Sequence, residues 1–217
     1  MDIKIRKAIP YEEVDTATLR QALSHYASRD DKIGDMVHRG ELIRARKGLY
    51  VIAPEYRQSP LSLEILANII YGPSYISLEY ALSIYGIIPE RATELTSVCL
   101  GRSRVFSTKV GNFSYCSIKK AAYTKGYDLI TLPDGRNYLM ATREKALVDI
   151  VENRRNIVIR SKKQIEKRLL EDLRMDESAL LELNADLVAH YASLYGSVKT
   201  KLLAGYIMDL NGGKKSE

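Results

Sequence analysis

Residues 28–54, SRDDKIGDMVHRGELIRARKGLYVIAP, decide the fold that the sequence predicts. Ser28 opens a capping-box pattern with an Asp three residues on, apolar residues then recur at helical spacing, and Gly40 supplies a helix stop. Two short strand-like segments, 42–45 and 49–53, come next, with a cationic turn between them. A short helix followed directly by a basic hairpin is typical of a recognition helix and a wing.

A second helix is predicted immediately before this stretch. Asp15 or Thr16 can cap it, and its apolar residues recur at i, i+4 and i+7, so that they lie on one face. The two helices would make a helix-turn-helix unit, in which the second helix buries its apolar residues against the first. We therefore expect residues 1–57 to form a winged helix-turn-helix domain that binds DNA.

Charge along this unit favours the hairpin over the helix as the source of DNA affinity. The outward face of the helix carries basic residues, but three Asp residues in the same helix cancel them, and carboxylates at its start would oppose phosphate. Positive charge returns in the hairpin. The plainer alternative is a small helical domain with a solvated charged face. The predicted DNA-contacting residues are Ser28, Arg29, Lys32, Arg39, Arg44, Arg46 and Lys47.

Composition limits the classes of protein that the chain can belong to. It has 217 residues, 46% of them hydrophobic, which fits two globular domains, and its net charge of +6 favours a polyanionic partner. The two cysteines and three histidines lack the spacing of a disulfide framework or a metal site, so we expect no metal and no cofactor. Without a signal-peptide pattern or an apolar run of membrane length, the expected location is cytoplasmic, away from membranes.

Residues 58–217 are expected to form a second, α+β domain. The proline-containing segment 54–60 is the predicted boundary, and Ser59 and Ser77 are the predicted caps of the two helices that follow. Three strand-like segments, TELTSVCL, RSRVFST and GNFSYCSI, then predict a small antiparallel sheet. A short strand is expected at 138–141. The caps predicted for the helices after it are Thr142, Ser161, Asp176 and Ser197.

One part of this second domain, residues 95–127, carries six Lys or Arg residues and no Asp or Glu. A stretch with basic residues and no acidic ones predicts a positive surface, which could touch the phosphate backbone of DNA beside the first domain. It could instead dock an acidic protein partner, or be an ordinary solvated sheet face. The predicted additional phosphate contacts are Arg102, Arg104, Lys109, Lys119 and Lys120.

No pattern in the sequence predicts a catalytic residue. Residues 117–120 match S-x-x-K, which occurs readily by chance, and Gly196 and Ser197 are not followed by the aspartate pair of a nucleotidyltransferase. A metal-dependent nuclease is the less favoured enzyme alternative, because its acids and lysine are not spaced to point at one place. The residues that it would use are Asp128, Asp134, Glu144 and Lys145. We therefore expect a protein that is not an enzyme.

Four segments in order carry a resemblance to a known family. They are RGELIRARKGLYVIAP, which closes the amino-terminal helical unit, then YISLEYALSIYGIIPER, TSVCLGRSRVFSTKVGNFSYCSI and ATREKALVDIV. With that helical unit included, the match covers roughly residues 18–151. This combination resembles the AbiEi antitoxins of type IV toxin–antitoxin systems.

The resemblance implies a winged helix-turn-helix transcriptional regulator that binds its own promoter as double-stranded DNA and represses its operon. Residues 28–39 would correspond to the recognition helix and 42–53 to the wing. The second domain would counteract a cognate nucleotidyltransferase-like toxin without forming a stable complex with it. Repression would be cooperative at repeated operator elements, and no catalytic residue is implied.

Overall fold

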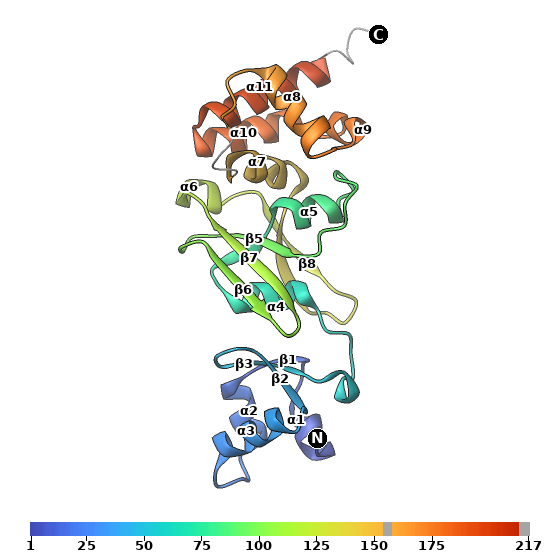
Figure 1. Cartoon of the computed structure of the whole chain (residues 1–217), viewed down its shortest axis with the longest axis vertical. Helices are drawn as coiled ribbons and strands as arrows, with labels where there is room; N and C mark the ends of the chain where they lie inside the picture. The colour runs from blue at the N-terminus through green and yellow to red at the C-terminus, as the bar shows by residue number, and fades with distance from the viewer. Residues whose placement is uncertain (154–157, 213–217) are drawn as a thin grey trace.

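Two β-sheets and eleven α-helices make up residues 1–153 and 158–212, which the computed structural model describes, and give a mixed α+β fold. Figure 1 shows three tiers along the long axis: an N-terminal unit, a larger sheet with its helices, and a group of C-terminal helices. No helix in the described residues is long and apolar enough to cross a membrane.

The N-terminal unit contains the predicted helices and hairpin together with two elements that were not predicted, a first helix and a short first strand. Its strands form an antiparallel sheet in the order β1-β3-β2, and its helices pack on that sheet around Leu19, Leu23, Met36 and Leu42, which are buried. The elements are α1 (Ile3–Ala8), β1 (Glu13–Asp15), α2 (Thr16–Ala22), α3 (Arg29–His38), β2 (Leu42–Arg46) and β3 (Leu49–Ile52).

The helix caps of this unit follow the prediction in one case and depart from it in the other. The side chain of Asp15 accepts a hydrogen bond from the Thr18 amide at 2.7 Å, as expected for an N-cap. Ser28 occupies the N-cap position of α3, but its side chain makes no capping hydrogen bond, so the predicted capping box is wrong. The Ser28 backbone, with ψ of 83°, lies outside the extended conformation that aims a capping oxygen at the helix.

The boundary segment 54–60 is tied down at both ends. A short 3₁₀ turn, Pro54–Tyr56, begins it, and the Ser59 amide and hydroxyl both donate to the Glu12 carboxylate at 3.0 Å. Ser59 is therefore not the cap of the next helix. That helix, α4 (Leu63–Ile70), begins three residues later, with Ser62 accepting from the Ile65 amide at 3.2 Å.

The second sheet is larger than predicted and is mixed, which corrects the expectation of a small antiparallel sheet. Its six strands lie in the order β6-β7-β5-β4-β9-β8, with β5 parallel to β7 and β4 parallel to β9. In the hairpin of β6 and β7, β7 lies on the inner side, where Phe113 and Tyr115 are buried, and the exposed strand β6 forms the edge of the sheet. The strands are β4 (Ser74–Ile76), β5 (Leu95–Cys99), β6 (Arg104–Thr108), β7 (Gly111–Ser117), β8 (Tyr127–Thr131) and β9 (Asn137–Ala141).

Helices cover this sheet and extend into the third tier. In Figure 1, α4 lies on the side of the strands towards the N-terminal unit, and α5 and α7 lie on the side towards the C-terminal helices. The predicted caps Thr142, Ser161, Asp176 and Ser197 all accept from a backbone amide of the helix that follows. The remaining helices are α5 (Leu78–Ile84), α6 (Lys120–Tyr123), α7 (Arg143–Asn153), α8 (Lys162–Lys167), α9 (Glu177–Leu181), α10 (Ala185–Tyr195) and α11 (Val198–Gly212).

A buried polar cluster joins the middle tier to the C-terminal helices. The Asp149 carboxylate accepts hydrogen bonds from Lys145 Nζ, from the Tyr195 hydroxyl at 2.5 Å and from the Ser77 hydroxyl at 2.7 Å. The Lys145 and Asp149 side chains have no exposed surface. Burial lowers the pKa of Lys145 below its ordinary value, and the charge of Asp149 opposes that shift. The cluster thus connects α7 with α10 and with the residue that precedes α5.

Candidate nucleic-acid interface

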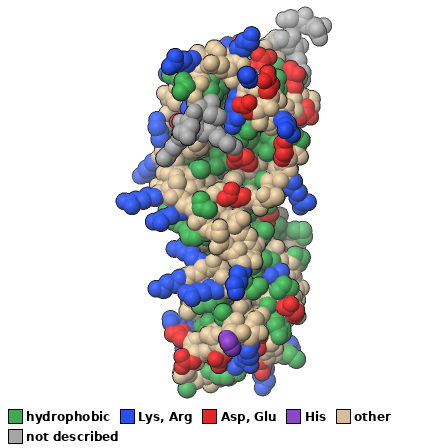
Figure 2. All heavy atoms as spheres, viewed as in Figure 1, with side chains coloured by type: hydrophobic (Ala, Val, Ile, Leu, Met, Phe, Trp, Pro, Cys, Tyr) green, Lys and Arg blue, Asp and Glu red, His purple; other side chains and the backbone are tan. Residues whose placement is uncertain are grey.

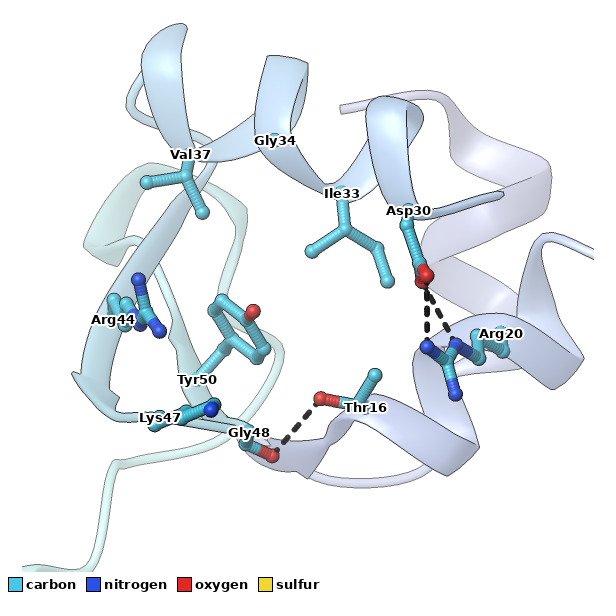
Figure 3. A pocket seen from close by; sticks show the side chains of 10 residues that line it. All are labelled: Thr16, Arg20, Asp30, Ile33, Gly34, Val37, Arg44, Lys47, Gly48 and Tyr50. Atoms are coloured by element: carbon cyan, nitrogen blue, oxygen red, sulfur yellow. Dashed lines mark hydrogen bonds and ion pairs between the residues drawn. The ribbon is translucent and has the colours of Figure 1, made fainter. Parts of the chain in front are cut away.

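A groove of about 360 Å³ lies between α3, the start of α2 and the β2–β3 hairpin. Figure 3 shows Val37 and Ile33 of α3 on one side, opposite Arg44, Lys47 and Tyr50 of the hairpin, and Asp30 of α3 turned towards Arg20 of α2. The lining residues are Thr16, Arg20, Asp30, Ile33, Gly34, Val37, Arg44, Lys47, Gly48 and Tyr50.

The hairpin side of the groove is held in place by its own turn and by α2. Gly48 has a φ of +82°, which favours glycine and closes the turn beside Lys47. The Gly48 carbonyl accepts from the Thr16 amide at 3.0 Å and from the Thr16 hydroxyl at 3.2 Å. Arg44 and Lys47 are exposed, so the hairpin presents two cations to the groove on a fixed support.

The helix side of the groove carries an ion pair that sequence patterns did not indicate. Arg20 of α2 donates through Nε to Asp30 Oδ1 and through Nη2 to Asp30 Oδ2, both at 2.8 Å. The hydrogen bond from Arg20 holds the pKa of the Asp30 carboxyl below its ordinary value. The pair therefore offsets part of the negative charge at the start of α3. It joins two helices across ten residues, so no single helical pattern contains it.

The four predicted helix residues are not among those that line the groove. Lys32 is half-buried with Nζ 4.9 Å from the centroid of the Tyr26 ring, and Arg29 Nη2 lies 3.4 Å from the Ser24 carbonyl. Arg39 pairs with Glu41 at 3.5 Å. Ser28 is exposed and borders a shallow hollow on the other side of the Arg20–Asp30 pair. The structure therefore does not bring these residues together with Arg44 and Lys47.

Arg46 has a different environment from its neighbours in the hairpin. Strand pairing shifts register between Arg44 and Arg46, and the Arg46 guanidinium donates to the Ile70 carbonyl at the end of α4. Its Cζ lies 5.6 Å from the centroid of the Phe106 ring in β6. Arg46 thus joins the hairpin to α4 and β6 instead of lining the groove.

A second arginine, Arg136, connects the larger sheet to β1, which is the edge strand of the small sheet opposite β2. Arg136 donates through Nη1 to Glu13 at 2.5 Å and through Nη2 to the Pro60 carbonyl at 2.9 Å. The Glu13 side chain is 1% exposed and also accepts from the Ser62 amide at 3.0 Å. These contacts, together with those of Arg46, fix the groove relative to the larger sheet.

The predicted basic residues of the larger sheet lie at both ends of the β6–β7 pair. Arg102 and Arg104 lie at the start of β6, Lys109 at the β6–β7 turn, and Lys119 and Lys120 at the start of α6, all exposed. Lys119 Nζ also donates to the Tyr195 carbonyl at 2.6 Å. Figure 2 shows Lys and Arg side chains one after another along the left edge of the molecule, from the C-terminal helices to the upper part of the N-terminal unit.

The residues of the nuclease alternative do not form a common site. Asp134 is bound by Arg136, Glu144 accepts from the Asn184 amide at 3.2 Å, and Lys145 is buried against Asp149. Asp128 is exposed on β8. Across residues 1–153 and 158–212, no group of three or more His, Cys, Asp or Glu residues is placed to hold a metal ion.

Neither models of protein families nor curated proteins match this chain. The candidate site is therefore defined by its geometry. It is a groove with a helix on one side and a cationic hairpin on the other, and Arg46 and Arg136 connect it to a sheet with a basic edge.

Proposed function

We propose that this protein is a DNA-binding antitoxin of the winged helix-turn-helix class that represses its own operon. The observation that carries the proposal is the groove between α3 and the hairpin, with Arg44 and Lys47 exposed on the hairpin side. The element order α1-β1-α2-α3-β2-β3, with β3 central in the small sheet, supports this class, because it places the second helix of the pair beside a hairpin.

DNA binding would use the two sides of the groove differently. The major groove of B-form DNA is about 12 Å wide and admits an α-helix, so α3 would enter it. The hairpin would lie across the adjacent backbone, where Arg44 and Lys47 would neutralise phosphates. Arg46 and Arg136 hold the larger sheet beside the N-terminal unit. The exposed Arg102, Arg104 and Lys120 would then add phosphate contacts along the same duplex.

The antitoxin role is proposed from the family resemblance of the four segments. These segments form the hairpin, α5 with its flanks, β5 to β7, and α7, so the resemblance includes parts of both domains. The second domain would counteract a nucleotidyltransferase-like toxin without a lasting complex. Co-expression with the toxin of the same operon tests this role: restored growth supports it, and continued toxicity at equal protein levels contradicts it.

DNA binding can be tested on the promoter of its own gene. Fluorescence anisotropy should show tighter binding to a labelled duplex of the upstream region than to a scrambled duplex of equal length, with affinity falling as salt rises. Equal affinity for both duplexes would contradict a sequence-specific repressor. Absence of binding at low salt would contradict any DNA-binding role.

A protein-binding role is the second candidate, and the exposed edge of the larger sheet favours it. Strand β6 is an edge strand of the six-stranded sheet, Val105 on it is 70% exposed, and Arg102 and Arg104 come just before that residue. Such an edge can pair with an added strand, and its charge suits an acidic partner. Co-purification with an acidic product of the neighbouring gene, without binding to upstream DNA, would favour this role.

Gly34 should be replaceable by alanine with a gain in stability. It lies inside α3, and an added Cβ would meet no atom within 4 Å, so the loss of backbone freedom in the unfolded chain would act without a clash. We expect Gly34→Ala to raise the free energy of unfolding by about 0.5–1 kcal/mol in urea titrations. The control is Gly40→Ala, which has the same open space but a φ of +72° and should destabilise the protein. A loss of stability in Gly34→Ala would contradict the helical placement.

A further inference from the structure

The Arg20–Asp30 pair has a geometry that selects one edge of the arginine. Nε and Nη2 donate to the two oxygens of one carboxylate at equal distances of 2.8 Å, which is the side-on, two-bond arrangement of a guanidinium and a carboxylate. The two side chains remain 52% and 65% exposed, so the pair is open to a ligand. Figure 3 shows it at the α2 end of the groove.

This arrangement leaves the other edge of the guanidinium free. Arg20 has five N–H donors, and Asp30 engages two of them. The remaining N–H groups of Nη1 and Nη2 lie side by side at the end of the side chain, and Asp30 restricts the rotation that would otherwise disperse them. Two parallel donors match the O6 and N7 acceptors that guanine presents in the major groove.

The surroundings of Arg20 favour a base edge over a phosphate as its ligand. A phosphate bound at Arg20 would also face the Asp30 carboxylate and be repelled by it, whereas guanine O6 and N7 carry no formal charge. The basic residues Arg29 and Lys32 of α3 do not line the groove. Arg20 is therefore the cation that the helix pair itself contributes to the groove, among its described lining residues.

We propose that Arg20 reads a guanine in the major groove and that Asp30 is its positioning residue, an inference that rests on the proposed DNA binding. It also gives the acidic start of α3 a role. Asp30 would lower the general attraction of the groove for phosphate while raising its selectivity for one base pair.

The test is a selection of bound duplexes from a pool with a randomised centre, followed by anisotropy on the selected duplex and on versions with each base pair changed. The wild-type protein should select a guanine at one position. Arg20→Ala should reduce the preference for that guanine by about 5- to 150-fold, the range of a bidentate arginine–guanine contact, and leave the other positions unchanged. Arg20→Lys should fail to restore it, because an ammonium cannot form the two parallel bonds.

Asp30→Ala tests whether Asp30 positions Arg20 for the guanine or only changes the overall affinity for DNA. It should reduce the preference at the same position while binding to non-selected duplexes stays equal or becomes tighter, because a negative charge has been removed. The double variant should show about the same loss of preference as Arg20→Ala alone, since the two residues act as a unit. Thermal unfolding of each variant verifies that it is folded at the assay temperature.

Each other outcome has a distinct meaning. Unchanged base preference in Asp30→Ala would overturn the positioning role. Equal weakening on every duplex in Arg20→Ala would overturn base reading and leave a phosphate contact. If the wild-type protein enriches no sequence but binds duplexes with a salt dependence, this inference fails while DNA binding stands. If it binds no duplex, the proposed function fails as well.

Discussion

Replacing Asp149 with alanine should lower the free energy of unfolding by about 3–5 kcal/mol, because the Lys145 ammonium would remain in the interior without its partner. Neither side chain has exposed surface, and the Tyr195 and Ser77 hydroxyls would also lose their acceptor. Urea titrations followed by circular dichroism measure the change. A shift below about 1 kcal/mol would contradict the burial of the pair.

Two controls test whether the loss of stability in Asp149→Ala comes from the burial of an unpaired charge and not from the loss of an ion pair as such. Lys145→Met combined with Asp149→Leu removes both charges and should be less destabilising than either single substitution, because no uncompensated charge remains. Glu171→Ala breaks the Lys167–Glu171 pair, which has the same i, i+4 spacing but side chains 67% and 68% exposed. That substitution should change the stability by less than about 1 kcal/mol. A double variant as unstable as the sum of its single variants would contradict this account.

Sequence patterns predicted α7 but not its buried pair. The Thr142 cap and the apolar residues Ala146, Leu147, Ile150 and Val151 were all recognisable, and the structure confirms both the cap and their burial. Lys145 and Asp149 at i, i+4 look like an ordinary solvated pair. Their burial depends on Tyr195, 46 residues beyond Asp149, and on Ser77, 72 residues before it. Contacts at such separations leave no local pattern.

In the sheets too, pairings between neighbouring segments were predictable from sequence, and pairings between distant segments were not. The hairpin of β2 and β3 was predictable because its strands are adjacent in sequence and its turn contains Lys47 and Gly48. The parallel pairing of β4 with β9 was not, since β4 has three residues and its partner lies more than sixty residues later. The polar lining of the groove was therefore only partly predictable. The positions of Arg44 and Lys47 could be predicted from the hairpin pattern, whereas the position of Arg20 depends on how α2 packs against α3.

Removing Arg44 and Lys47 together should weaken DNA binding and flatten its dependence on salt. Each phosphate contact that is lost should reduce the slope of log K against log salt by about 0.9, since fewer counterions are released on binding. Both residues are exposed at the groove and the hairpin is fixed by Thr16, so alanine at these positions should leave the fold unchanged. Anisotropy over a series of salt concentrations measures the slope. An unchanged slope would remove the hairpin from the DNA contact.

Arg46→Ala is the matched control, because it removes the same charge from the same hairpin. The Arg46 guanidinium is bound to the Ile70 carbonyl and stacked near Phe106, so it is not available to a phosphate at the groove. We expect Arg46→Ala to leave the salt slope unchanged and to loosen the joint between the domains, which limited proteolysis would detect as faster cleavage within residues 54–60. If Arg46→Ala lowers the slope as much as one of the groove cations does, Arg46 must leave Ile70 when DNA binds. The domain joint would then open on binding, and the two domains could not act as one fixed surface along the duplex.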